Sequence, residues 1–221
     1  MRALIFAAAA IVMTAGPSFA QSTQDERGYV TAGGGFAISS DTTSGDVLAE
    51  VGWRVARNLF VFGDLGQFHN LQPSQLQPTV DTTDVMLSAN GISVTGTARV
   101  PALQALAGLR YAIPTGKGFE PYVLGGIGLA RLSPTAQFTY TSGTLTGFTP
   151  TAGQDVTSQL VSLGDYTQPA ASTAFMFTLG GGVDVPVAPY LVVDVGYRVS
   201  RISADTPVNA SSIVAGFGYR F

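Results

Sequence analysis

The sequence predicts an all-β fold, a single eight-stranded antiparallel β-barrel that crosses a membrane. The first observation behind this prediction is a period of two. Near the C-terminus, Ile213, Phe217 and Phe221 share one face of a strand, while small or charged residues fill the positions between them. The second observation is that charged residues make up only 11% of the chain, against about 25% in typical soluble domains. The third is that short and long connections alternate along the chain, as they do in outer-membrane barrels.

The segment 1–20 has the features of a secretory signal peptide. Arg2 gives it a positive start, an apolar run follows over 4–13, and a Ser-Phe-Ala triplet that resembles a cleavage site ends at Ala20. The apolar run is too short to span a bilayer. We therefore expect cleavage after Ala20, which leaves 21–221 as one barrel domain. The alternative is a buried N-terminal helix.

The composition narrows the classes of function. The chain has no cysteine, which excludes disulfides and thiolate metal sites, and it has a single histidine. We therefore expect no metal and no cofactor. The net charge of -3 argues against a nucleic-acid partner.

Each predicted strand shows apolar residues at every second position and is bounded by turn-forming residues. In the first half these strands are 28–38, where valine and phenylalanine alternate with glycine and threonine; 47–55, with valines and a tryptophan on one face; 59–67, which follows a tight Arg-Asn turn; and 101–111, with leucines and a tyrosine on one face. In the second half they are the glycine-rich 121–132, with Val123, Ile127 and Leu129 outward; 175–185, with two phenylalanines outward; 191–200, with valines outward; and the closing strand 209–221.

Seven charged residues fall on the faces that this alternation turns inward, namely Glu50, Arg54, Asp64, Arg110, Asp184, Asp194 and Arg198. A charge turned toward lipid near the bilayer midplane would cost roughly 2–4 kcal/mol. The interior of an eight-stranded barrel is only wide enough for side chains to fill it, and buried charges need partners. We therefore expect a lumen plugged by paired acids and arginines. The alternative is a narrow channel lined by the same groups.

The connections between strands differ in length. The short ones lie near Arg57, Gly116 and Ala188, and the longer ones lie near Thr42, Gln77, Gly153 and Thr206. An even number of strands puts both ends of the barrel chain on one side, so we expect short periplasmic turns and longer extracellular loops. The two longest connections, 68–96 and 133–171, are rich in Gln, Thr, Ser, Gly and Pro, and we expect them to be polar loops. Their aromatic residues either contact another surface or tuck into the barrel mouth; they are Phe138, Tyr140, Phe148 and Tyr166.

Four stretches carry a family resemblance: GYVTAGGGFA (28–37), EPYVLGGIGLAR (120–131), LVVDVGYRVSRI (191–202) and the terminal GFGYRF. Together with the signal segment, they resemble the small outer-membrane β-barrel family of OmpA-like and opacity-type porin-family proteins, in its barrel domain only. The resemblance implies a location in the cell outer membrane, surrounded by outer-membrane lipid.

The C-terminal residues also resemble the assembly signal of that family. Gly216, Tyr219 and Phe221 match its pattern, whereas Val214 stands where a polar residue is usual. The resemblance implies recognition by the outer-membrane barrel assembly machinery and by periplasmic chaperones. The alternative is that the two aromatic residues only belong to an interfacial girdle.

These observations predict a non-enzymatic, monomeric protein with a structural or surface-interaction role. A surface ligand would bind through the loops 72–96 and 133–171. The alternatives are a narrow pore for small or apolar solutes, a lipid-modifying barrel enzyme and a soluble periplasmic barrel. The enzyme alternative lacks a catalytic set, because His69 lies five residues from Asp64 and would face the opposite side of a continuing strand.

Overall fold

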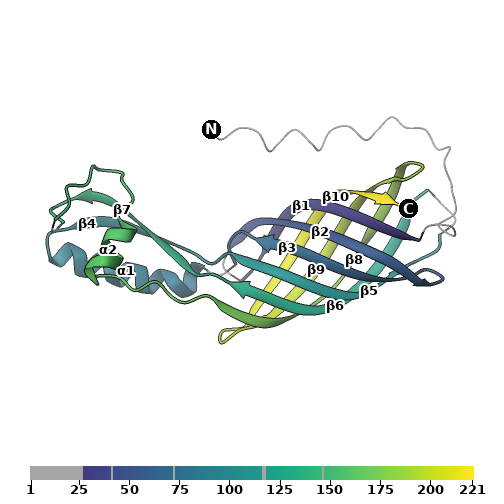
Figure 1. Cartoon of the computed structure of the whole chain (residues 1–221), viewed down its shortest axis with the longest axis horizontal. Coiled ribbons are helices and arrows are strands. Elements are labelled where there is room, and N and C mark those ends of the chain that lie inside the picture. The colour runs from purple at the N-terminus through teal and green to yellow at the C-terminus, as the bar shows by residue number, and fades with distance from the viewer. Residues whose placement is uncertain (1–26, 41, 72, 116–117, 146) are drawn as a thin grey trace.

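The computed structural model describes residues 27–40, 42–71, 73–115, 118–145 and 147–221. It shows a closed barrel of eight strands with an extension at one end (Figure 1). The barrel strands are β1 (Gly28–Ile38), β2 (Thr43–Ala56), β3 (Leu59–Phe68), β5 (Ala102–Ala112), β6 (Glu120–Leu132), β8 (Ser172–Ala188), β9 (Leu191–Ser203) and β10 (Val208–Arg220). The predicted eight-stranded antiparallel barrel is therefore confirmed. The predicted signal peptide lies outside the described residues.

The barrel closes between its first and last strands. β1 pairs with β10 from Tyr29 opposite Arg220 to Ile38 opposite Ser211. At the end of this seam, the Phe221 amide donates to the Gly28 carbonyl over 2.9 Å, and the Gly28 amide donates back over 2.8 Å. Closure removes the free strand edges that would otherwise expose backbone donors and acceptors.

The two ends of the barrel differ. One end has the tight turns and Phe221, the last residue of the β1–β10 seam, and we call it the turn end. We call the opposite end the extension end. At the turn end, Asn58 has a φ of 64°, the left-handed conformation that allows a two-residue turn between β2 and β3. The predicted strand 175–185 ends too early, because β8 continues through a bulge to Ala188. The turn Pro114–Gly118 is only partly within the described residues.

The outer wall of the barrel is apolar over most of its height. Side chains predicted to face outward are exposed, including Leu65 (64%), Ile127 (62%) and Phe217 (61%). Such a surface suits hydrocarbon and not water. Within the described residues, neither helix is long and apolar enough to cross a membrane.

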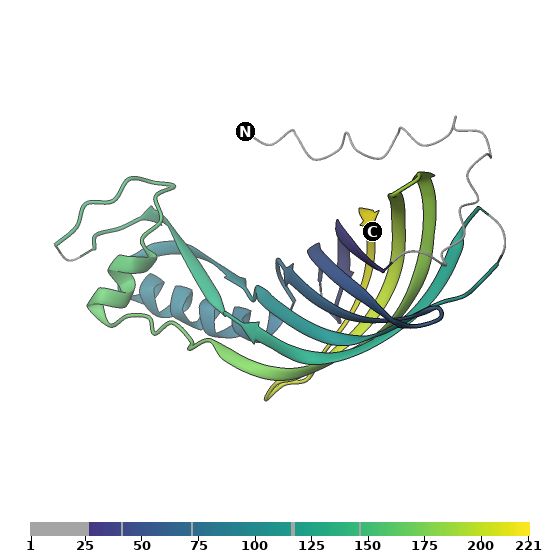
Figure 2. The ribbon, with the colours of Figure 1, turned by 45° about the vertical axis from the view of Figure 1, so that its right-hand side comes forward.

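The two longest connections are not the polar loops that the sequence predicted. They form α1 (Pro73–Ala89), β4 (Ser93–Arg99), β7 (Thr135–Ser142) and α2 (Thr157–Leu163). β4 pairs with β7 as a separate two-stranded ribbon, and both helices lie beside it (Figure 2). We call this unit, residues 73–99 and 135–171, the extension.

A hydrophobic core of its own holds the extension together. Phe138, Val80 and Leu160 are fully buried in it, and the Phe138 and Tyr166 rings meet edge to face with centroids 4.9 Å apart. Tyr140 is also buried there, and Phe148 packs against the same cluster. These aromatic residues therefore pack within the extension's own core and not in the barrel mouth.

Both long edges of the β4–β7 ribbon are covered. Asp84 of α1 accepts a hydrogen bond from the Gly96 amide over 2.9 Å, and Gln77 accepts one from the Ala98 amide over 3.1 Å. On the β7 side, the Val156 amide donates to the Phe138 carbonyl over 2.9 Å. Burial raises the pKa of Asp84. The ribbon thus has few open backbone groups for pairing with another chain.

We expect the extension to unfold independently, while the barrel stays folded. Phe138→Ala removes its central ring, and burial losses of this kind cost about 3–5 kcal/mol. The variant should be cut faster than the parent by limited proteolysis within the extension, while the barrel keeps its heat-modifiable mobility in gels.

Val85→Ala is the matched control, because Val85 lies on the same extension and is 70% exposed. Equal protease resistance of Phe138→Ala and Val85→Ala would contradict an independent core in the extension.

Candidate functional site

Glu50 is the centre of a polar cluster in the lumen. It lies inside the barrel on β2, and its side chain is fully buried. The Tyr29 hydroxyl donates to Glu50 Oε1 over 2.5 Å. Arg110 approaches the same oxygen at 3.3 Å, and Arg198 donates to Oε2 over 2.7 Å. One carboxylate therefore joins β1, β5 and β9 across the lumen.

The ion pairs continue from both arginines. Arg198 also pairs with Asp64 on β3. Arg110 pairs with Asp184 on β8 at 2.6 Å and lies 3.7 Å from Asp194 on β9. Each guanidinium thus bridges carboxylates from different strands, a use that suits its planar, multiply donating geometry.

The network extends to the turn end through Arg220, which the sequence analysis did not include among the lumen charges. Arg220 pairs with Glu120 at 2.7 Å and with Asp184 at 2.8 Å. Arg220 is on the inward face of the closing strand, so the alternation that selected Arg198 also applies to it. Glu120 lies at the start of β6, just before the segment predicted as a strand.

Six of the seven predicted lumen charges are buried together, and Arg54 is set apart from them. Arg54 is half-buried near the turn end, with its guanidinium 5.3 Å from the centre of the Phe60 ring. The described ion pairs of the lumen therefore join five acids to three arginines: Glu50, Asp64, Glu120, Asp184 and Asp194 with Arg110, Arg198 and Arg220. Because acids are in excess, each of these arginines contacts at least two carboxylates.

Two tyrosines complete the cluster, and glycines make room for them. The Arg110 guanidinium lies 3.5 Å from the centre of the Tyr122 ring and 4.6 Å from that of Tyr29. A Cβ on Gly52 would lie 2.1 Å from the Tyr29 ring, and one on Gly182 would lie 2.5 Å from the Tyr122 hydroxyl. The glycines of these strands thus serve interior packing.

An apolar layer lies between the ion pairs and the extension end of the lumen. Phe68, Leu71, Met176 and Ile202 are buried in it with almost no exposed area. The pattern of inward charges in the sequence does not predict this apolar layer. The lumen therefore contains two stacked layers of buried side chains, one ionic and one apolar.

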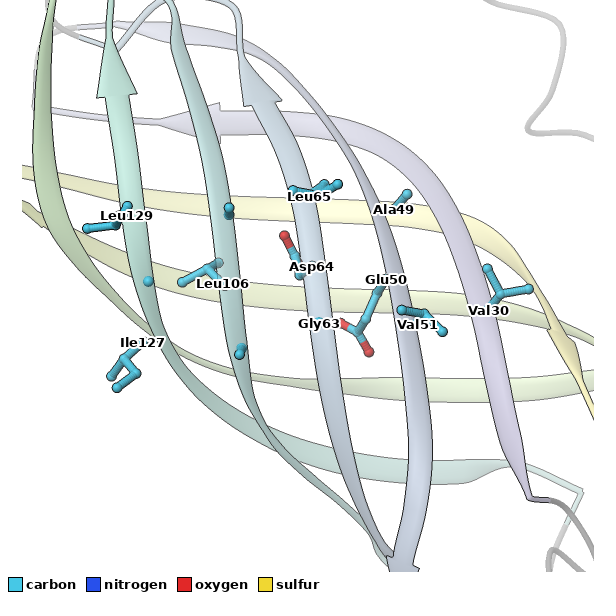
Figure 3. A pocket seen from close by; sticks show the side chains of 13 residues that line it. Val30, Ala49, Glu50, Val51, Gly63, Asp64, Leu65, Leu106, Ile127 and Leu129 are labelled. Carbon is cyan, nitrogen blue, oxygen red and sulfur yellow. The ribbon is translucent and has the colours of Figure 1, made fainter.

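The outer wall carries a shallow depression of about 610 Å³ over the strands that hold Glu50 and Asp64 (Figure 3). Apolar side chains that face outward surround it, among them Leu65 and Ile127. The two acids belong to the lumen side, where they pair with arginines. The depression thus offers hydrocarbon contact but no reactive group.

The histidine and acid considered in the sequence analysis do not meet. Asp64 is buried in the lumen, whereas His69 is exposed beyond the end of β3, with its amide bonded to the Gly45 carbonyl over 2.9 Å. In the part of the chain that the structure describes, no group of three or more histidine, aspartate or glutamate side chains could hold a metal ion.

Hydrogen bonds from Thr157 hold the pKa of Asp155 in the extension below its usual value.

The residues of the predicted assembly signal lie along the closing strand. Tyr219 and Phe221 point outward at the turn end and are 47% and 43% exposed. The Phe221 ring lies beside the Trp53 ring, with centroids 5.9 Å apart. Gly216 faces inward, and a Cβ there would lie 2.3 Å from the Ala32 carbonyl. The aromatic pair is thus placed both for a girdle and for recognition from the turn end.

A closed barrel with an apolar outer wall and a polar, ion-paired interior defines a membrane-spanning β-barrel protein. Comparison with protein families agrees: the family model of the outer membrane protein beta-barrel domain matches residues 6–221. The chain belongs to this family, and its place is the cell outer membrane.

Solved structures of small outer-membrane barrels are similar to this chain. Neisserial surface protein A is 19% identical, with 88% of this chain and 97% of that chain covered and a TM-score of 0.53. Ail, the attachment invasion locus protein of Yersinia pestis, is 15% identical with the same coverage and a TM-score of 0.46. OprG from Pseudomonas aeruginosa is 14% identical, with 89% and 97% covered and a TM-score of 0.46. The search of curated proteins gave no match. The first of these likenesses supports the fold.

Removing the central carboxylate should destabilise the barrel. In Glu50→Gln, the buried Arg198 and Arg110 lose a charged partner, and breaking a buried ion pair on one side costs about 3–5 kcal/mol. The urea midpoint of unfolding in detergent micelles should fall accordingly. Asp205→Asn, which changes an exposed acid between β9 and β10, should leave the midpoint unchanged. The importance of the network would be refuted by equal midpoints for the two variants.

Deletion of Phe221 tests the assembly signal. The shortened chain should still be exported but should accumulate in the periplasm with reduced insertion into the outer membrane, because the terminal aromatic residue would no longer be recognised. Fractionation of cells and protease accessibility of the extension would measure both steps. Trp53→Ala removes the neighbouring girdle ring and leaves the terminus intact. Normal insertion without Phe221, or an equal defect in Trp53→Ala, would leave only the girdle role.

Proposed function

We propose that this protein is a non-conducting, non-enzymatic outer-membrane barrel whose role is carried by the folded extension outside the cell. The observation that carries the proposal is the filling of the lumen by two layers, the ion pairs around Glu50 and the apolar layer around Phe68 and Met176. A barrel built to conduct would need a continuous polar path, and the apolar layer interrupts it.

The orientation follows from the two ends of the barrel. The tight turn at Asn58 and the β1–β10 seam at Phe221 lie at one end, and the extension lies at the other (Figure 1). In bacterial outer-membrane barrels the short turns are periplasmic and the longer connections are extracellular. The extension is accordingly extracellular. This orientation also fits a cleaved signal peptide over 1–20 and insertion by the barrel assembly machinery.

The architecture of the extension supports a surface-interaction role. It is rigid, because it has a separate core and both ribbon edges are covered. Rigid elements present a binding surface more accurately than mobile loops do. α1, which lies in the extension beyond the end of the barrel (Figure 2), turns Val85 and Met86 outward, 70% and 61% exposed. A surface ligand would meet a preformed face here.

Planar-bilayer recordings test whether the barrel conducts. The purified full chain should give no reproducible conductance steps, because both layers of the lumen are closed. Met176→Ala, which thins only the apolar layer, should also stay silent, since the ion pairs remain. Reproducible openings in the parent, with a size that changes in Glu50→Gln or Arg198→Gln, would establish the narrow pore instead.

A further inference from the structure

The eight barrel strands turn their charges inward with two exceptions. Arg131 on β6 and Arg201 on β9 occupy positions on the outward face, and both are exposed. No acidic residue lies at an outward position of these strands. The lipid-facing wall therefore carries charge of one sign only, although the whole chain has a net charge of -3.

Both arginines lie where the apolar band ends. Arg131 follows the outward Leu129 by two positions, and Arg201 follows the outward Val199 in the same way. Each is close to the extension end of its strand. An outward charge costs about 0–1 kcal/mol near a membrane interface, against 2–4 kcal/mol at the midplane, so these positions tolerate arginine.

The opposite rim is built differently. Outward positions at the turn end carry aromatic rings, and the Tyr190 and Tyr219 rings lie with centroids 6.0 Å apart. Aromatic residues are common at both membrane interfaces, whereas the outward strand arginines lie only at the extension end. Outward aromatic rings also lie toward the extension end, on Phe36 and Phe175, so the difference between the two rims is the pair of outward strand arginines.

The two arginines flank β8 from either side. Arg131 is opposite Thr173 and Arg201 is opposite Phe177. Four residues along β8 and two strand spacings separate their backbones by roughly 16 Å. The Arg201 guanidinium also donates to Asn209 Oδ1 over 3.5 Å, which directs it along the rim. The pair is thus spaced for two phosphate groups and not for a single shared one.

We propose that Arg131 and Arg201 bind the phosphates of a diphosphorylated glycolipid in the outer leaflet. The guanidinium group suits this role, because it donates two parallel hydrogen bonds to a phosphate. The lipid's acyl chains would then lie along the apolar wall formed by residues such as Phe175 and Phe177 of β8. The inference rests on the orientation given above, with the extension end outside the cell.

Native mass spectrometry of the full chain tests the inference. The protein is taken from phosphatidylcholine vesicles that contain diphosphorylated lipid A, and the lipid A retained per protein is counted. Arg131→Gln with Arg201→Gln should lower retention about fivefold for each arginine removed. Lysine at both positions should restore part of the retention, since charge returns without the paired hydrogen bonds.

The matched control is Arg27→Gln with Arg57→Gln, which removes two exposed arginines at the turn end. It should retain lipid A like the parent. Equal retention in both double variants would overturn the inference, because the outward arginines would then be solvated anchors. Displacement of lipid A by inorganic phosphate at equal concentration would also overturn it, in favour of a simple anion site. Conductance by the parent would refute the sealed lumen and leave this result unaffected.

Discussion

The structure depends on the burial of the Glu50 carboxylate inside a barrel that lipid surrounds. A charge at this depth must be matched locally, because neither the lipid nor the filled lumen supplies enough water to solvate it. Arg110 and Arg198 match it from β5 and β9, and Tyr29 donates from β1. The two arginine contacts connect β2 with strands that are not its neighbours in the sheet, so they fix the cross-section of the barrel in a way that backbone hydrogen bonds between adjacent strands do not.

The lumen holds two layers of buried side chains, and they lie toward opposite ends of the barrel. The ionic layer lies toward the turn end, where Arg220 ties the closing strand to Asp184 on β8. The apolar layer lies toward the extension end, where Phe68 and Leu71 begin the connection that leads to α1. The extension is therefore attached at the end of the barrel that holds the apolar layer. Its own core around Phe138 is separate from both layers of the lumen, so the extension can fold without contributing to them.

The strands of the barrel and most of the inward charges were predictable from the sequence, because alternation in a lipid-facing strand leaves little choice of face. The same parity would have found Arg220 and Asp46, which are both buried. The extension was harder to predict. Leu76, Val80, Thr83 and Leu87 have helical spacing and are buried, but Pro78 and the many Gln and Thr residues of this stretch suggest a loop. Tertiary contacts, such as those of Gln77 with β4, decide the outcome, and no local pattern reveals them.

The period of two also explains why outward charged residues occur only at the rims of the barrel. Within the membrane band an outward position accepts only apolar or small residues, and an inward position must fit the filled lumen. Only at the ends of the strands can an outward residue be charged at little cost. Arg131 and Arg201 use this freedom at one rim, and Trp53 and Phe221 fill the other with aromatic rings. An outward residue at a rim therefore meets the membrane interface, whereas an outward residue between the rims meets hydrocarbon alone.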